Sequence, residues 1–187
     1  MINDKGSPMM VKFIDGKKIY LRPVLKEDLN KDYLGWINDR DNDQLTSHAL
    51  YPYNLEALED YFTRKSNDRS CLWLAIIIKD THQHIGNIEL ARIDHVNRNA
   101  EFRIVIDHKA QNQGYGYESS KLMIDHALKV LNLHRIYLGV HEDNKGAIAL
   151  YKKLGFELEG TFRDHFCRQG QYSNVLSMGL LATDRMR

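Results

Sequence analysis

Two kinds of hydrophobic spacing follow one another along this chain, and they predict where it forms helices and where it forms strands. Apolar residues three and four apart indicate amphipathic helices over residues 25–38, from Asn54 onward, from Tyr117 onward and over 144–154. Apolar runs or alternation between polar turns indicate strands at residues 18–23, 71–79, 84–93, 100–107, 135–141, 157–168 and 172–181. Residues 1–16 are expected to be a flexible N-terminal tail, and residues 17–187 a single domain.

The order of these elements predicts the fold class. Strands 71–79, 84–93 and 100–107 are separated by short polar segments, as in antiparallel hairpins. The strand at 100–107, the long helix after it and the strand at 135–141 form a β-α-β unit, which implies parallel strands and a right-handed crossover. We therefore expect an α/β (α+β) fold, with one mixed sheet and helices on both faces.

Composition narrows the functional classes. The net charge is +1, so no strong field favours nucleic acid or an acidic membrane surface. The longest apolar run, residues 72–78, is too short to cross a bilayer, and the first ten residues lack the apolar core of a signal peptide. Cys71 and Cys167 do not form a Cys-x-x-Cys pair, so we expect neither a metal site nor a disulfide framework. These features predict a cytoplasmic protein with no nucleic-acid or membrane partner.

One glycine-containing loop stands where chemistry is expected. Gln111-Asn112-Gln113-Gly114-Tyr115-Gly116 separates a predicted strand from the long helix. Free backbone N–H groups and the positive end of a helix dipole meet at such a point and bind phosphate. The simpler interpretation is that both glycines only turn the chain. The loop is not a Walker motif, because Tyr117 and Glu118 follow Gly116, and it lies too late in the chain for a dinucleotide fingerprint.

The loop also carries a resemblance to a known family. Gln-x-x-Gly-x-Gly after a strand resembles motif A of the GNAT superfamily of N-acetyltransferases. Residues 144–156, Asn-Lys-Gly-Ala-Ile-Ala-Leu-Tyr-Lys-Lys-Leu-Gly-Phe, resemble the family's second conserved block. The stretch from His95 to Tyr172 is most similar to the branch of spermidine and ribosomal-protein N-terminal acetyltransferases. The resemblance implies a GNAT-like fold with splayed parallel strands, acetyl-CoA as cosubstrate, and direct attack by a primary amine in a ternary complex.

The family's coenzyme contacts can be placed on this sequence. Backbone amides of the loop would hold the pyrophosphate. The preceding strand, which has a bulge in the family, would bind the pantetheine arm through its backbone. Asn144 would contact the arm near the thiol, although it also reads as a plain helix N-cap. The resulting cofactor-binding set is Ile104, Val105, Ile106, Gln111, Asn112, Gln113, Gly114, Tyr115, Gly116, Tyr117 and Asn144.

The resemblance also suggests the proton-transfer groups. A phenol is protonated at neutral pH, so Tyr151 can donate to the departing thiolate; the alternative is a core tyrosine on an amphipathic helix. Glu101 and Glu89 are candidates for the base that deprotonates the amine, and each can instead be a solvated or paired carboxylate. His141 is a weaker candidate for that base.

The acceptor amine is expected to bind to the N-terminal third of the chain. Its informative features are residues 36–39, the aromatic segment 47–53 with His48, Tyr51 and Tyr53, and the acidic residues Asp39, Asp41 and Asp43, which also fit a solvated turn. The sequence leaves a polyamine, a protein N-terminus, an aminosugar and an antibiotic amine open. A non-catalytic acetyl-CoA-binding module and a nucleotide-phosphate binder are the alternative functions. Alternation over residues 157–181 suggests an edge pair that forms a homodimer.

Overall fold

The computed structural model describes residues 12–38 and 52–185. Its helices are the 3₁₀ segments η1 (Lys26–Asp28), η4 (His108–Ala110) and η5 (Ala182–Arg185) and the α-helices α1 (Lys31–Ile37), α2 (Leu55–Asn67), α3 (Tyr115–Lys129) and α4 (Lys145–Lys153). Its strands are β1 (Ile14–Asp15), β2 (Ile19–Pro23), β3 (Leu72–Ile78), β4 (His84–Asp94), β5 (Asn99–Ile106), β6 (Arg135–His141), β7 (Glu157–Arg168) and β8 (Gln171–Leu181). Within these ranges no helix has the length and hydropathy that a membrane crossing needs.

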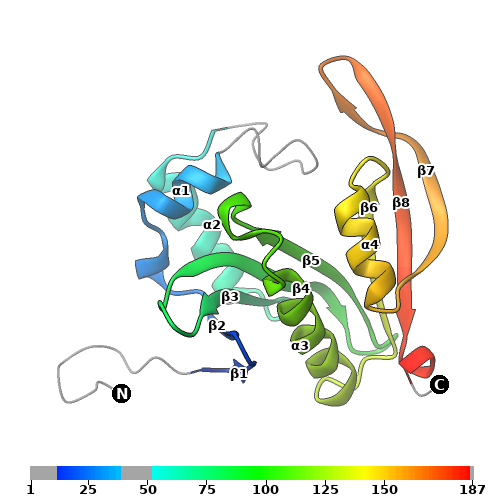
Figure 1. The fold of residues 1–187 in the computed structure, drawn as a ribbon, viewed down its shortest axis with the longest axis horizontal. Helices are drawn as coiled ribbons and strands as arrows, with labels where there is room; N and C mark the ends of the chain where they lie inside the picture. The colour runs from blue at the N-terminus through cyan, green and yellow to red at the C-terminus, as the bar shows by residue number, and fades with distance from the viewer. Residues whose placement is uncertain (1–11, 39–51, 186–187) are drawn as a thin grey trace.

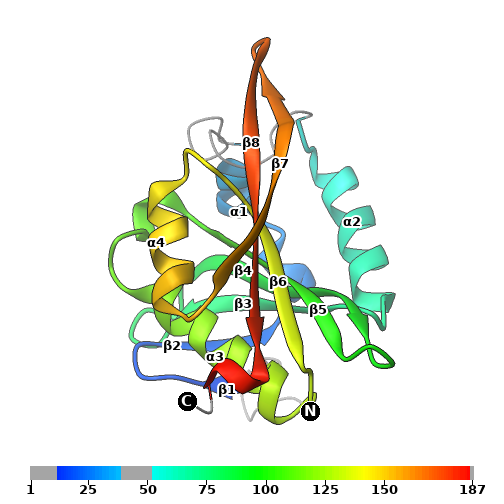
Figure 2. The same ribbon diagram turned by 90° about the vertical axis from the view of Figure 1, so that its right-hand side faces the viewer.

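All eight of these strands belong to one sheet, in the order β1-β2-β3-β4-β5-β6-β8-β7 (Figure 1). The β5–β6 pair is parallel, as the β-α-β unit predicts, and the other neighbouring pairs of the described chain are antiparallel. The expected mixed α/β sheet is confirmed. β7 forms one edge of the sheet, and the long β7–β8 hairpin extends beyond the rest of the molecule in Figures 1 and 2.

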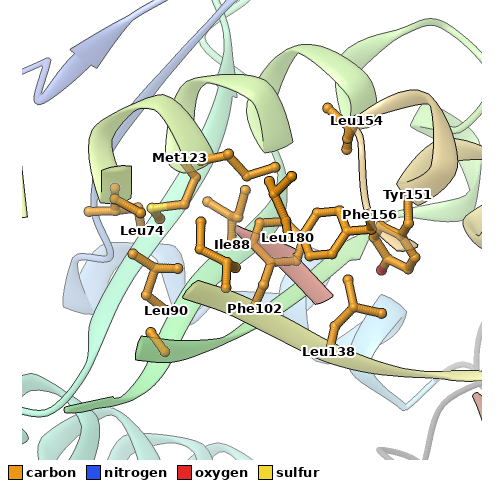
Figure 3. Packing of buried hydrophobic residues seen from close by; sticks show 14 of the residues in the cluster. Leu74, Ile88, Leu90, Phe102, Met123, Leu138, Tyr151, Leu154, Phe156 and Leu180 are labelled. Atoms are coloured by element: carbon orange, nitrogen blue, oxygen red, sulfur yellow. The ribbon is translucent and has the colours of Figure 1, made fainter. Parts of the chain in front are cut away.

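Helices cover both faces of this sheet, and strand alternation decides which residue meets which layer. On β2, Ile19 and Leu21 join the core beneath α3 and α4, whereas Tyr20 between them packs with the residues facing α2. α2 lies on one side of the sheet in Figure 2, with α3 and α4 on the other. Figure 3 shows the larger core, in which Met123 of α3 faces strand residues such as Ile88 and Leu90.

The parallel strands separate soon after they meet. β5 and β6 pair over three positions, from Asn99 opposite Arg135 to Glu101 opposite Tyr137. β5 then continues to Ile106 and β6 to His141 without further pairing. The splay implied by the family resemblance is therefore present. It leaves backbone groups on the facing edges of both strands without a strand partner.

The expected bulge, however, is not in β5. From Glu101 to Ile106 the register of β5 on β4 is regular. The extra residue lies in β4, between Ala91 and Asp94, where Arg92 has a φ of 52°. The free backbone edge of β5 thus arises from the divergence of β6 and not from a bulge in β5 itself.

In the N-terminal region the structure differs from two predicted boundaries, those of the first helix and of the tail. The helix predicted over residues 25–38 is interrupted, because Asp28 turns back to accept hydrogen bonds from the Leu25 N–H (2.8 Å) and from both terminal nitrogens of Arg22 (2.6 and 2.7 Å). Asn30 then starts α1 by accepting from two backbone N–H groups of its first turn. In the predicted tail, Ile14 and Asp15 pair with β2, while residues 1–11 lie outside the described chain.

Candidate active site

The loop before α3 presents backbone donors at one point. Asn112 (φ 61°) and Gly114 (φ 87°) adopt left-handed conformations, and the helix begins at Tyr115. The first-turn N–H groups of Tyr115, Gly116 and Tyr117 have no acceptor within the helix, and no side chain caps it. These donors and the helix dipole form a site suited to an anionic phosphate.

Two glutamine side chains stabilise this loop by hydrogen bonds to backbone carbonyls of the residues before it. Gln111 Nε2 donates to the Ile106 carbonyl (3.1 Å), and Gln113 Nε2 donates to the Lys109 carbonyl (3.1 Å). Gly116 packs closely, since a Cβ there would lie 3.3 Å from Ile106 Cδ1. The predicted residues 111–117 are therefore adjacent to the end of β5. The Gln111 N–H already donates to the His108 carbonyl (3.2 Å), so it is the amides of residues 112–117 that remain available to a ligand.

The register of β5 decides which of its backbone groups face the splay. The Asp107 N–H donates to the Ile85 carbonyl (2.8 Å), so Gly86 and Ile106 form a non-hydrogen-bonded pair. By alternation, Val105 directs its N–H and C=O groups at β4, whereas Ile104 and Ile106 direct theirs toward the side where β6 diverges. Of the three predicted strand residues, Ile104 and Ile106 present their backbone to the splay and Val105 does not.

Tyr151 lies on α4, at the end of the large core that is nearest the splay. Its ring packs edge-on against Phe102 of β5 (6.2 Å between centroids) and Phe156 (5.8 Å). Figure 3 shows the ring at one end of this cluster, next to Phe156. Burial raises the pKa of Tyr151 to about 12, so its hydroxyl remains a proton donor well above neutral pH. That hydroxyl has no hydrogen-bond partner among the described residues, and it is not fully enclosed.

Asn144 caps α4, as the alternative interpretation predicts. Its Oδ1 accepts from the Ala147 N–H at 3.0 Å. The cap uses only the oxygen of the side-chain amide. Within the described chain the Nδ2 group has no partner, so capping and a ligand contact are compatible.

The two candidate carboxylates differ sharply in position. Glu101 lies where β5 and β6 still pair, and it is bound by Arg103 (2.8 and 3.0 Å) and Arg92 (3.4 Å). Glu89, on β4, is buried and lines a cavity; its Oε1 accepts from the Lys65 ammonium and from the Cys71 thiol (3.1 Å). Only Glu89 combines burial with access to an internal space.

This inner cavity has a volume of about 260 Å³ and lies between helices α1 and α2 and strands β3 to β5. Its walls are mainly aromatic and aliphatic, with a few polar groups. The lining residues are Tyr33, Ile37, Tyr53, Leu58, Tyr61, Lys65, Trp73, Asn87, Glu89, Arg103, Ile104 and Val105. Ile104 belongs both to this wall and to the free edge of β5, so the inner cavity and the splay meet at this residue.

Sequence reasoning missed the helical partners of Glu89. Lys65 comes from α2, on the same face as Tyr61 four residues earlier, and Tyr61 packs edge-on against Trp73 (5.5 Å). Burial lowers the pKa of Lys65, but the hydrogen bond to Glu89 and the electrostatic attraction of Tyr61, Glu89 and Cys71 together outweigh it, so the pKa lies above its ordinary value. The Tyr61–Lys65 spacing was the available signal, although it does not name the carboxylate that Lys65 meets.

Other predicted residues lie elsewhere or outside the described chain. His141 ends β6 with its ring against Phe166, and its Nδ1 is 3.3 Å from Ser173 Oγ. Burial lowers the pKa of His141, which keeps the ring neutral. Residues 39–51 lie outside the described chain, and with them the expected acceptor features Asp39, Asp41, Asp43, His48 and Tyr51.

A second, larger cavity of about 670 Å³ adjoins the inner one at Tyr33. Its lining is polar and includes the buried Arg22–Asp28 ion pair, His84 and residues 107–109. Asn87 stands between the two spaces, with its Nδ2 donating to the Tyr33 hydroxyl (2.8 Å) and its Oδ1 2.9 Å from His84 Nε2. Neither Ile104 nor Glu89 lines this space, whereas Asp107, which directly follows β5, does.

Comparisons with known proteins agree with this geometry. The family model described as an acetyltransferase (GNAT) domain matches residues 18–157. A spermidine N(1)-acetyltransferase of Escherichia coli K12 is 33% identical, over 86% of this chain and 84% of its own. An L-amino acid N-acetyltransferase of the same organism is 38% identical over 42% of this chain and 49% of its own.

The crystal structure of a spermidine N-acetyltransferase from Vibrio cholerae, in complex with CoA and spermine, superposes with a TM-score of 0.82 at 27% identity. It covers 91% of this chain and 99% of the other. Fold, loop and family model therefore lead to one conclusion. The chain belongs to the GNAT family of acetyltransferases and is an acyltransferase that moves an acetyl group from acetyl-CoA to an amine.

Proposed function

We propose that acetyl transfer takes place where the inner cavity meets the splay of β5 and β6, and that the acceptor is a small-molecule primary amine. One observation carries this proposal: Ile104 contributes to the cavity wall and also turns its backbone toward the splay. A thioester held along β5 and an amine held beside Glu89 would meet at that residue.

The coenzyme contacts follow from the free donors and acceptors. The loop amides from Asn112 to Tyr117 hold the pyrophosphate. Ile104 and Ile106 pair with the amides of the pantetheine arm, in the manner of a neighbouring strand. The Asn144 Nδ2 group donates to the arm near its thiol end. Tyr151, seven residues later on the same helix, then lies two turns from that contact.

Glu89 and Tyr151 serve two of the proton movements in the reaction. The acceptor ammonium loses one proton to Glu89, directly or through water, and the neutral nitrogen attacks the thioester carbonyl. A C–N bond forms as the C–S bond breaks, the Tyr151 hydroxyl gives its proton to the departing sulfur, and the nitrogen releases its second proton to solvent. The products are the N-acetyl amine, free CoA and one proton, with the tyrosinate reprotonated from the acid formed at Glu89 by way of solvent.

A polyamine is the second acceptor class, and sequence similarity favours it. The spermidine acetyltransferase of Escherichia coli aligns with this chain over 86% of its length. Spermidine is therefore the comparison substrate for any acceptor that the cavity suggests.

The test is thiol release from acetyl-CoA with a panel of primary amines, with the N-acetyl product identified by mass spectrometry. We expect release that depends on both substrates. If acetyl-CoA raises the melting temperature but no amine yields product, the chain is a coenzyme-binding module and the catalytic proposal fails. If ATP or NAD stabilises the protein and acetyl-CoA does not, the loop is a nucleotide site.

Two further sequence predictions remain proposals. We infer a homodimer from the edge position of β7 and the exposed Leu158, Phe162 and Tyr172 on the terminal hairpin. We also place the reaction in the cytoplasm, where the unpaired Cys71 and Cys167 would stay reduced.

A further inference from the structure

The acceptor class can be narrowed from the charges of the inner cavity, on the basis of the function proposed above. Glu89 is the one carboxylate among the described lining residues, which also include Lys65 and Arg103. Both Glu89 and Lys65 are largely buried, with side-chain exposures of 8% and 15%. The cavity therefore already holds an ammonium group of its own beside its carboxylate.

One oxygen of the Glu89 carboxylate accepts no hydrogen bond from the described residues. Oε1 accepts both the Lys65 ammonium and the Cys71 thiol. Oε2 has no partner within the described chain, and it is not fully enclosed. One incoming amine nitrogen can therefore hydrogen-bond to Glu89, and no second carboxylate in the described lining is available for another.

A second positive charge on the acceptor would be unfavourable in this space. Lys65 stays protonated, because its bond to Glu89 and the charges around it raise its pKa by more than burial lowers it. Arg103 adds a guanidinium, whose counter-ion Glu101 is not part of the lining. Like charges repel strongly in a partly buried, low-dielectric site, so these two cations discriminate against a polycation.

The remaining walls suit an apolar body. Tyr33, Tyr53, Tyr61 and Trp73 supply aromatic surface, and Ile37, Leu58 and Val105 supply aliphatic surface. The volume of about 260 Å³ lies near the small end of ligand cavities, which matches a single ring and a short chain. An aromatic ring would pack against Trp73 and Tyr61 in the offset or edge-on geometries that such rings prefer.

We propose that this enzyme acetylates a primary monoamine with an aromatic or apolar body, and that the Lys65–Glu89 pair excludes acceptors that carry further positive charges. The reacting nitrogen brings a single charge, binds to Glu89 Oε2 and loses its proton there. Lys65 acts as a specificity-determining residue, because it occupies the oxygen that a second ammonium would need.

The test compares 2-phenylethylamine, butylamine and spermidine as acceptors for the full-length protein. We expect kcat/KM for 2-phenylethylamine to exceed that for spermidine by at least about tenfold, with butylamine between them. Calorimetric titration of the CoA-bound protein should show the same order of affinity, without dependence on turnover. Preferential turnover or tighter binding of spermidine would overturn the inference and leave the acetyltransferase function intact.

Substitutions locate the effect. Lys65→Met removes the cavity cation and retains the apolar stem, so it should shift the ratio of kcat/KM values toward spermidine by about tenfold. Arg64→Met makes the same charge change one residue away on an exposed position of α2, and it should leave the ratio unchanged. Trp73→Leu should lower the affinity for 2-phenylethylamine more than the affinity for butylamine. The shift produced by acetyl-CoA in the melting temperature confirms that each variant is folded, and an unchanged ratio in a folded Lys65→Met enzyme would refute the role of Lys65.

Discussion

Replacing Tyr151 by phenylalanine separates chemistry from packing at the proposed site. The substitution keeps the ring against Phe102 and Phe156 and removes only the hydroxyl. Because that hydroxyl has no hydrogen-bond partner within the described chain, no partner is left unsatisfied. The free energy of unfolding should change by less than about 1 kcal/mol, the size of one hydrogen bond, and the melting temperature by less than about 4 °C.

The effect on catalysis should be far larger. Loss of a general acid lowers kcat by about a hundredfold, which corresponds to about 2.7 kcal/mol of transition-state stabilisation. The affinity for acetyl-CoA should stay nearly constant, because the proton is donated only as the C–S bond breaks. Steady-state kinetics with the best amine and calorimetric titration with CoA measure the two quantities. Tyr172→Phe, which removes an exposed hydroxyl from β8, is the matched control and should behave like the wild type.

The pH dependence sharpens this prediction. Burial raises the pKa of Tyr151 to about 12, so the phenol stays protonated throughout the usual assay range. The ratio of wild-type to Tyr151→Phe kcat should therefore be constant between about pH 7 and pH 10. A Tyr151→Phe enzyme with near-native kcat would show that water supplies the proton. A ratio that falls toward one across this range would show that the donor has a much lower pKa than the structure implies.

Three other perturbations test separate parts of the structure. Gly114→Ala introduces a side chain at φ 87°, which should cost about 1–2 kcal/mol of stability in denaturant unfolding. It also places a Cβ in the open space before the α3 amides, so acetyl-CoA should stabilise the variant much less than the wild type. Gly160→Ala is the control, because Gly160 has no strained φ and a Cβ there meets no neighbour. Asp28→Ala leaves Arg22 buried without its partner and should cost about 3–5 kcal/mol. Burial alone would raise the pKa of Asp28, but the hydrogen bonds from Arg22 and Leu25 outweigh burial and bring the pKa below its ordinary value of 3.8. The stability that the Asp28 carboxylate provides should therefore be fully present above about pH 3.8 and be lost as the pH falls below it, which urea unfolding at a series of pH values can measure. Phe162→Asp should shift the protein to a monomer in light scattering if the terminal hairpin forms the homodimer, and a wild-type monomer at micromolar concentration would refute that assembly.

The sequence predicts those features of the fold that depend on local periodicity. The order of strands, the crossover helix, the loop at Gln111–Gly116 and the position of Tyr151 on a short helix all follow from spacing and from two motifs. The interruption of the first helix could not be predicted from spacing, because it depends on the ion pair between Asp28 and Arg22, which lies on another element. Asn30, followed by an amphipathic turn, was a readable N-cap signal for the second start.

The geometry of the proposed site was more predictable on its coenzyme side than on its acceptor side. Backbone amides at a helix N-terminus are the consequence of a short motif, whereas the inner cavity is assembled from five separate elements. Glu89 was one of two equivalent carboxylates until its bond to Lys65, 24 residues away, distinguished it from Glu101. Pairings at such separation depend on the packing of α2 onto the sheet, which no periodic pattern specifies.

The divergence of β5 from β6 has a consequence for hydrogen exchange. In the middle of an eight-stranded sheet, amide protection would ordinarily be uniform along a strand. Here the amides of Arg103 and Val105 are bonded to β4, whereas those of Ile104 and Ile106 face the splay. Protection should therefore alternate residue by residue along β5 in the free protein, and bound CoA should slow exchange at the alternate positions alone. In the complex, the coenzyme arm would then protect the Ile104 and Ile106 amides from exchange, as a neighbouring strand would in a continuous sheet.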